Sequence, residues 1–254
     1  MQGLVDGACG GDGRLVVIEG SGGIGKTRLL WATRAIAESA GMRVLVARAG
    51  EFEGEFAYGI VRQLFEPLVA AASPALRAEL LSGAAGLVEP LFDAAQLAAT
   101  PQEAAGEGFF AVLHGLYWLA ANVALQQPTL LAVDDLHWAD SPSLRWLAYL
   151  TRRLEGLPIL VVVATRAPEG ESREPTLLTD LIADPRSAAI RPEPLGRTSI
   201  TVLAREFYDL EPDEAFSAAL ETATGGNPLF VGAVLDTVAR ERISPASQNV
   251  PRLL

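Results

Sequence analysis

The chain has 254 residues, of which 50% are hydrophobic, and it carries a formal net charge of −11. This length and apolar content exclude a disordered chain and suffice for a sizeable core. The acidic balance argues against general nucleic-acid binding by this segment, because negative surfaces repel phosphate backbones. A single cysteine, Cys9, excludes an internal disulfide framework and fits a reducing compartment, and we expect it to be a small surface residue.

The sequence carries no signal for secretion or for crossing a membrane. Its N-terminus lacks the basic start and apolar run of a signal peptide. The most apolar stretch, residues 109–125, falls short of the roughly 20 residues that a spanning helix needs and contains His114 and Asn122. We therefore expect a buried helix there, no membrane contact and a cytoplasmic protein.

Short apolar runs alternate with long helical patterns, which predicts an α/β fold with a parallel sheet between helices. Uniformly apolar runs are typical of strands that are covered on both faces. The predicted strands are residues 14–20, 43–50, 129–135, 158–166 and 188–195. Helices are predicted from about 25 to 40, across an alanine-rich region that ends near 127 with breaks at Pro74, Pro90 and Pro101, and over 139–156, and an exposed loop over 167–176.

The helix over 139–156 has clear boundary signals, with Ser141 as the expected cap and Pro142 in the first turn. From residue 199 the pattern is only helical, which predicts a small lid beside the sheet. We assign residues 1–196 to an α/β domain, for which the glycine-rich segment described next predicts the P-loop NTPase type, 197–243 to a helical lid, and 244–254 to a linker or the truncated start of a following domain.

The segment GSGGIGKTR, between the first strand and the first helix, fits two fingerprints. Its glycines match the G-x-G-x-x-G of a dinucleotide fold, and the whole string matches the G-x-x-x-x-G-K-T of a phosphate loop. Lys26 and Thr27 favour the phosphate loop, which needs an ammonium for the β- and γ-phosphates and a hydroxyl for Mg²⁺. The predicted nucleotide contacts are Gly20, Ser21, Gly22, Gly23, Ile24, Gly25, Lys26, Thr27 and Arg28.

A nicotinamide-dependent oxidoreductase is the alternative that the overlapping fingerprint leaves open. Its ribose-binding acid would be Glu51, about 26 residues beyond Gly25, which is later than the usual spacing of about 20.

The strand over 129–135 ends in two acids that could complete an NTPase site. We expect Asp134 to hold Mg²⁺ opposite the Thr27 hydroxyl, and Asp135 to accept a proton from, or orient, the attacking water. Arg166, after the next strand, could sense or stabilise the γ-phosphate. The candidate catalytic residues are therefore Asp135, Lys26 and Arg166, with Thr27 and Asp134 as metal ligands.

Each of these residues also has a plainer interpretation. The acidic pair could form a turn or a helix cap, and Arg166 could be a surface arginine. His137 and Trp138 are expected to pack the loop after the strand. His114 is expected to be a buried or half-buried histidine with its hydrogen bonds satisfied.

The segments GSGGIGKTRLL, LLAVDDLHWADSPSLRWLAYL, ILVVVATR and ATGGNPLFV together resemble the ATPase module of large ATP-binding LuxR-type bacterial regulators. These are signal-transduction ATPases with numerous domains (STAND proteins), relatives of AAA+ proteins. The resemblance is strongest over 14–34, 129–166 and 220–235. It implies Walker A and Walker B motifs, ATP or ADP with Mg²⁺ as ligands, and Pro228 of Gly226-Asn227-Pro228 against the adenine.

The resemblance also implies a function. We expect Mg-ATP binding and slow hydrolysis by the nucleotide-switch module of a transcription regulator, with self-association on nucleotide binding and no direct nucleic-acid binding by this segment. Relatives carry a Gly-Arg-Glu segment and a helix before the first strand, and a winged helix after the lid, and this chain is expected to lack both. That expectation motivates the alternative of a non-hydrolysing nucleotide-binding interaction or assembly module.

Overall fold

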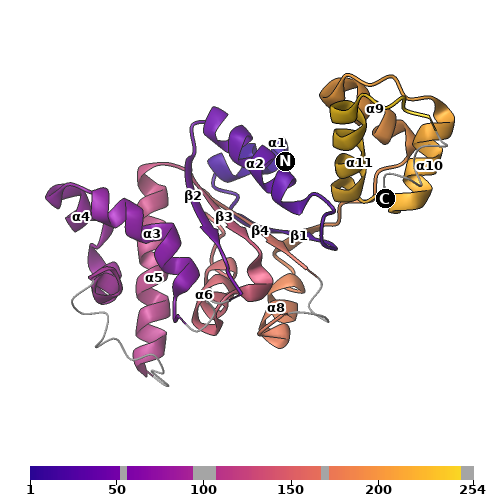
Figure 1. Cartoon of the computed structure of the whole chain (residues 1–254). Coiled ribbons are helices and arrows are strands. Elements are labelled where there is room, and N and C mark those ends of the chain that lie inside the picture. Colours follow the sequence, from indigo (N-terminus) through magenta and orange to yellow (C-terminus); the bar gives the residue numbers. More distant parts are fainter. Residues whose placement is uncertain (52–55, 94–106, 167–171, 247–254) are drawn as a thin grey trace. The chain divides into compact units, whose positions relative to one another are not determined.

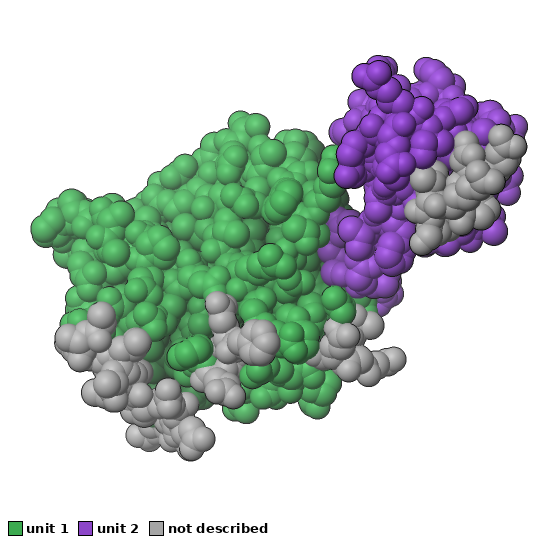
Figure 2. Space-filling model, in the orientation of Figure 1, with its two compact units in different colours: residues 1–19, 27–190 green, residues 20–26, 191–254 purple. Residues whose placement is uncertain are grey.

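The computed structural model describes residues 1–51, 56–93, 107–166 and 172–246. The chain forms two compact units, drawn in green and purple in Figure 2. The first unit holds residues 1–19 and 27–190, and the second holds residues 20–26 and 191–254. The second unit therefore joins the glycine loop to the C-terminal helices.

Within the described residues, the first unit is built on a five-stranded sheet in the order β2-β3-β4-β1-β5 (Figure 1). Every neighbouring pair of strands is parallel. The strands are β1 (Arg14–Glu19), β2 (Arg43–Arg48), β3 (Thr129–Asp134), β4 (Ile159–Thr165) and β5 (Ser187–Ile190). The predicted parallel sheet is confirmed, and the central strands β3 and β4 are buried at every position.

Helices cover both faces of this sheet because side chains alternate between the faces along each strand. On one face, Val16 and Ile18 of β1 pack against α1 (Gln2–Cys9) and α2 (Lys26–Ser39). On the other, Leu15 and Val17 join a larger core with the other described helices of this unit. Those are α3 (Gly59–Ala71), α4 (Pro74–Leu80), η1 (Gly83–Phe92), α5 (Glu107–Gln126), η3 (Leu136–Trp138), α6 (Ser141–Thr151) and α8 (Pro175–Ile182).

Helix α5 is the apolar helix that the sequence predicts. Its stretch Gly108–Gln126 is, in the described part of the chain, the helix that length and composition would allow to cross a membrane. However, 44% of its most apolar window is buried, and Leu116, Leu119 and Val123 belong to the larger core. These contacts fit a core helix that covers the sheet.

The second unit has a small core of its own among α9 (Arg197–Tyr208), α10 (Glu214–Thr224) and α11 (Pro228–Glu241). Ile200, Phe216 and Leu235 are fully buried in it, one from each helix. The turn between α10 and α11 contains Gly225 and Gly226 at φ +60° and +68°, a region that favours glycine. Pro228 lies in the first turn of α11, where its missing N–H costs no hydrogen bond.

Several boundaries differ from those predicted. A helix, α1, precedes β1, although none is expected there, because Val5 and Ala8 gain a buried face against the sheet. Helix α8 begins at Pro175, inside the loop expected over 167–176, because Leu178 and Leu181 gain buried positions in the larger core, and its remainder was not predicted. Strand β5 stops at Ile190, and α6 ends at Thr151. The break at Pro101, the segment 167–171 and the segment 247–254 lie outside the described residues.

The predicted cap of α6 is also wrong, because Asp140 rather than Ser141 occupies that position. The Asp140 carboxylate is 4% exposed and accepts the backbone N–H of Ser143 at 2.9 Å. It also accepts the N–H groups of Tyr58 (2.8 Å) and Gly59 (3.0 Å) at the start of α3. Helix N-termini have unpaired donors and favour negative charge, so one buried carboxylate fixes the starts of two helices.

Asp140 also affects the residue that begins α3. Tyr58 has a left-handed backbone with φ +60° and is 5% exposed. Burial, together with the negative charge of Asp140, raises the pKa of Tyr58 to about 12. The phenol beside this carboxylate therefore stays protonated into a more alkaline range than an ordinary tyrosine, whose pKa is about 10.

We predict that Asp140→Ala lowers the free energy of unfolding of the first unit by about 3 kcal/mol, because it leaves three buried donors without their acceptor. Ser73→Ala is the matched control, since Ser73 caps α4 through a single exposed bond to Leu76, and it should cost no more than about 1 kcal/mol. Urea unfolding followed by tryptophan emission measures both. Equal losses in the two variants would contradict the double cap.

Candidate functional site

The four longest strands end at the same edge of the sheet, where ligands bind in parallel α/β folds. Strand β1 leads into the glycine loop, β2 ends at Arg48, β3 ends at Asp134, and β4 ends at Thr165, before Arg166. The register pairs Arg48 with Asp134. The predicted acids and the arginine after β4 are therefore carried by neighbouring strand ends.

Asp134 joins the end of β3 to the start of α2. Its carboxylate is 7% exposed and accepts the Thr27 hydroxyl at 2.9 Å and the backbone N–H of Asp135 at 2.9 Å. Thr27 and Asp134 lie 107 residues apart in the sequence. A hydroxyl and a carboxylate are oxygen donors of the kind that Mg²⁺ prefers, so this pair fits the predicted metal ligands in chemistry.

Asp135 has a left-handed backbone, with φ +52° and ψ +39°, and begins η3. Aspartate is among the residues that tolerate this region. Its Oδ2 accepts two hydrogen bonds from the Arg48 guanidinium, from Nε at 3.0 Å and Nη2 at 2.9 Å. The Arg48 side chain is 75% exposed and that of Asp135 24%. The candidate catalytic acid is thus engaged by an arginine at the end of the next strand.

Arg48 is itself held by Gln63 of α3. The amide of Gln63 accepts the Arg48 backbone N–H at 2.8 Å and donates to the Arg48 carbonyl at 3.0 Å. Sequence reasoning missed both residues, because neither belongs to a recognised motif. The available signal was positional, since Arg48 ends a predicted strand next to the one that carries the acids.

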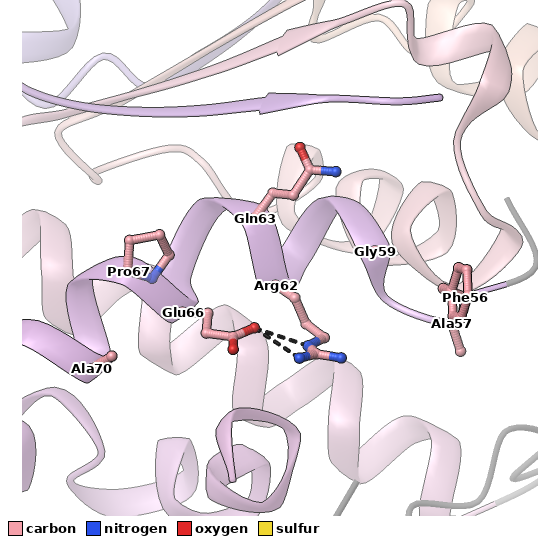
Figure 3. A pocket seen from close by; sticks show the side chains of 8 residues that line it. All are labelled: Phe56, Ala57, Gly59, Arg62, Gln63, Glu66, Pro67 and Ala70. Carbon is pink, nitrogen blue, oxygen red and sulfur yellow. Dashed lines mark hydrogen bonds and ion pairs between the residues drawn. The ribbon is translucent and has the colours of Figure 1, made fainter. Parts of the chain in front are cut away.

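A hollow of about 500 Å³ opens on α3 next to Gln63 (Figure 3). Apolar residues form part of its wall, and Arg62 and Glu66, which lie one turn apart on α3, line it as an ion pair at 2.9 Å. The described residues that line it are Phe56, Ala57, Gly59, Arg62, Gln63, Glu66, Pro67 and Ala70. None of the predicted nucleotide contacts is among them.

The glycine loop has the conformation that its glycines allow. Gly23 and Gly25 have φ of +79° and +100°, where other residues are strained. The ammonium of Lys26 donates to the carbonyls of Gly20 at 2.8 Å and Ser21 at 2.9 Å, and this residue is only 8% exposed. Two carbonyl groups of the loop therefore point toward the ammonium of Lys26, the first residue of α2.

The N-terminus of α11 contacts the same loop inside the second unit. Asn227 donates its side-chain N–H to the carbonyl of Gly22 at 2.9 Å. The backbone N–H of Leu229 reaches the carbonyl of Gly23 at 3.2 Å. Pro228, which the resemblance places against an adenine, lies between these two contacts in the chain.

A family model for the AAA ATPase domain matches residues 1–162. The chain belongs to this family. It is therefore a P-loop NTPase module, in agreement with the glycine loop, Lys26 and the acids at the end of β3.

Known proteins resemble the AAA chain over most of its length. An uncharacterized protein of Rhizobium meliloti (strain 1021) is 27% identical over 269 residues, which cover 93% of this chain and 24% of the relative. The ORC2 protein of Aeropyrum pernix, solved as ADPNP–ADP complexes, shares the fold at TM-score 0.51, with 16% identity over 98% of this chain and 63% of that one.

A third similarity is to a STAND protein with a tetratricopeptide repeat sensor from Pyrococcus horikoshii. It has a TM-score of 0.46 and 18% identity, and it covers 91% of this chain and 28% of that one. The AAA chain thus spans about a quarter of the length of its curated relative and of this larger structure.

The other singled-out residues of the AAA chain have varied surroundings. Arg28 on α2 and Arg166 after β4 are exposed. His137 is buried in η3, with its ring 5.1 Å from that of Trp138, in line with the expected packing role. His114 accepts from Trp118 and contacts the Tyr149 hydroxyl, so its expected hydrogen bonding is confirmed. The described residues contain no group of three or more His, Cys, Asp or Glu side chains placed to hold a metal.

We predict that Thr27→Val lowers the free energy of unfolding of the first unit by about 1 kcal/mol, because the Asp134 carboxylate loses one donor. Thr33→Val is the matched control on the same helix. The Thr33 hydroxyl donates to the Leu29 carbonyl one turn earlier, a bond that helices do not need. Urea unfolding of both variants should show a loss only for Thr27→Val, and equal losses would contradict the role of this contact.

Proposed function

We propose that this AAA module binds Mg-ATP and hydrolyses it slowly. The observation that carries the proposal is the hydrogen bond between Thr27, which follows the loop lysine, and Asp134 at the end of β3. It joins the two halves of sequence that a P-loop NTPase needs, a hydroxyl after the loop and an acid after a buried strand. Membership of the AAA ATPase domain family supports the same conclusion.

Each residue of the site has a separate role in the proposed binding of Mg-ATP. Lys26 exchanges its bonds to the loop carbonyls for the β- and γ-phosphate oxygens. The loop N–H groups and the N-terminus of α2 bind phosphate, since both concentrate positive potential. Thr27 and Asp134 would hold Mg²⁺, which would supply positive charge next to the phosphate oxygens. Pro228 contacts the adenine.

Asp135 orients the attacking water and accepts its proton, and Arg166 stabilises the γ-phosphate. In the arrangement described above, the Asp135 carboxylate is occupied by Arg48. Hydrolysis by this route requires Asp135 to exchange Arg48 for water. Arg48 therefore restrains turnover, and the restraint is small because the pair is partly exposed.

The same contact favours one alternative function. If Asp135 stays bound to Arg48, the module retains nucleotide without turnover and acts as an interaction or assembly module. The two functions share a binding site and differ in phosphate release.

We further propose a regulatory setting for the module. The resemblance to LuxR-type regulators supports the role of a nucleotide switch, with residues 197–243 as the lid and self-association when nucleotide binds. The net charge of −11 supports the absence of direct nucleic-acid binding by this segment. The resemblance to bacterial transcription regulators also supports a cytoplasmic location for the module.

Binding is tested by calorimetry with ATP and ADP, with and without Mg²⁺. Lys26→Ala should weaken ATP binding by about 10- to 100-fold, because a charge-assisted contact is lost. Lys26 is the one lysine of the chain, so an amine-directed ester has a single side-chain target, and the Met1 amine serves as internal reference. Mg-ATP should slow labelling of Lys26 alone. A folded chain that binds no nucleotide would refute the proposal.

Hydrolysis is tested by steady phosphate release. Asp135→Asn should keep nucleotide affinity and reduce turnover about 100-fold or more, as expected on loss of a general base. Arg48→Ala should raise turnover by up to about fivefold, because it frees Asp135. Arg77→Ala, which removes an ion pair to Glu89 elsewhere in the first unit, is the control and should change neither value. Tight binding without release above background would establish the non-hydrolysing alternative.

A further inference from the structure

Asn227 makes two different hydrogen bonds with the two ends of its amide. Its oxygen accepts the backbone N–H of Leu229 at 3.0 Å, which caps α11. Its nitrogen donates to the carbonyl of Gly22 at 2.9 Å, across 205 residues of sequence. Capping alone needs only an acceptor oxygen, so the second bond is an additional property of asparagine at this position.

Gly23 packs so closely against the N-terminus of α11 that a side chain at this position would clash. A Cβ added to Gly23 would lie 2.6 Å from the Asn227 side-chain oxygen and 2.8 Å from the Leu229 Cβ. The φ of +79° is a second reason for glycine. The Leu229 N–H also reaches the Gly23 carbonyl at 3.2 Å. The loop and α11 therefore meet at a distance that leaves no room for a side chain.

These contacts fix the direction of loop donors. A trans peptide is planar, so its C=O and the following N–H point in opposite directions. The bond from Asn227 to the Gly22 carbonyl therefore orients the N–H of Gly23 away from α11. Anion-binding loops depend on such N–H groups being turned toward the phosphate before it arrives.

We propose that Asn227 is a positioning residue, which orients the phosphate loop for the nucleotide and couples occupancy of the loop to helix α11. The inference rests on the proposed nucleotide binding and deepens it. Occupied loop N–H groups favour the peptide orientation that Asn227 holds. This coupling is reciprocal. If bound nucleotide strengthens the contact between Asn227 and the loop by some factor, then forming that contact strengthens nucleotide binding by the same factor.

The test separates the capping bond from the bond to the loop. Asn227→Ser keeps a good capping oxygen without charge, but its side chain is too short to donate to Gly22. Asn227→Asp keeps the size and the cap, and it turns an acceptor toward the Gly22 carbonyl. We expect Mg-ATP and Mg-ADP affinity to fall about fivefold for Asn227→Ser and about tenfold or more for Asn227→Asp, as for one lost hydrogen bond and one replaced by repulsion.

Calorimetric Kd and thermal unfolding are measured on the full chain for each variant. Asp213→Ser is the control, because Asp213 caps α10 in the same unit through Phe216. Its affinity should be unchanged. Weakened binding with unchanged thermal unfolding in Asn227→Ser supports the proposal. Wild-type affinity in Asn227→Ser overturns it, even if Asn227→Asp binds weakly, since charge alone then explains the loss.

The same measurements distinguish the two levels of inference. A wild-type chain that binds no nucleotide overturns both the proposed function and the role of Asn227. A wild-type chain that binds, with Asn227→Ser equal to it, overturns the role of Asn227 alone. If Asn227→Ser unfolds, Asn227→Thr supplies the comparison, because it also keeps an uncharged capping oxygen on a side chain too short to donate to Gly22, and wild-type affinity there also overturns the proposal.

Discussion

The buried carboxylate of Asp140 is the constraint on which the edge of the sheet depends. It accepts three backbone donors and so fixes where α3 and α6 begin. The start of α3 sets the place of Gln63, whose amide pairs with the backbone of Arg48, and Arg48 in turn binds Asp135. A residue outside the predicted site is thus linked, through helix α3 and the end of β2, to the side chain that binds the candidate catalytic acid.

The second unit stabilises one conformation of the glycine-rich loop. Glycines permit the positive φ angles at positions 23 and 25, but they bring no side chains that could stabilise the result. The stabilising groups are the side chain of Lys26, next to the glycines, and Asn227 and Leu229 at the N-terminus of α11. Glycines and hydrogen bonds from Lys26, Asn227 and Leu229 together give the loop a defined shape.

Much of the fold could be read from the sequence because it rests on local pattern. Uniform apolarity identifies β1, β3 and β4, and the glycine loop identifies the junction with α2. What was missed depends on distant contacts. Arg48 lies 87 residues from Asp135 along the chain, and Asn227 lies 205 residues from Gly22, so no spacing rule connects them.

Local signals also misled at two places. Both Ser141 and Asp140 are good caps, and the choice between them is decided by α3, whose N–H groups only Asp140 reaches. Helix α1 has glycines at positions 3 and 7, which lower its helical propensity, and it forms because the sheet buries Val5 and Ala8. In both cases tertiary packing outweighs the local preference.

The composition of the second unit has a consequence for how such modules are recognised. A shortened chain that ended after β5 would still contain the glycine loop, Thr27, Asp134 and Asp135, and any motif search would report it as intact. It would nevertheless have lost the helix end that holds two of the loop carbonyls. Possession of every signature residue and competence to hold the loop in shape are separate properties, and the second depends on Asn227, which lies 205 residues after Gly22 of the loop.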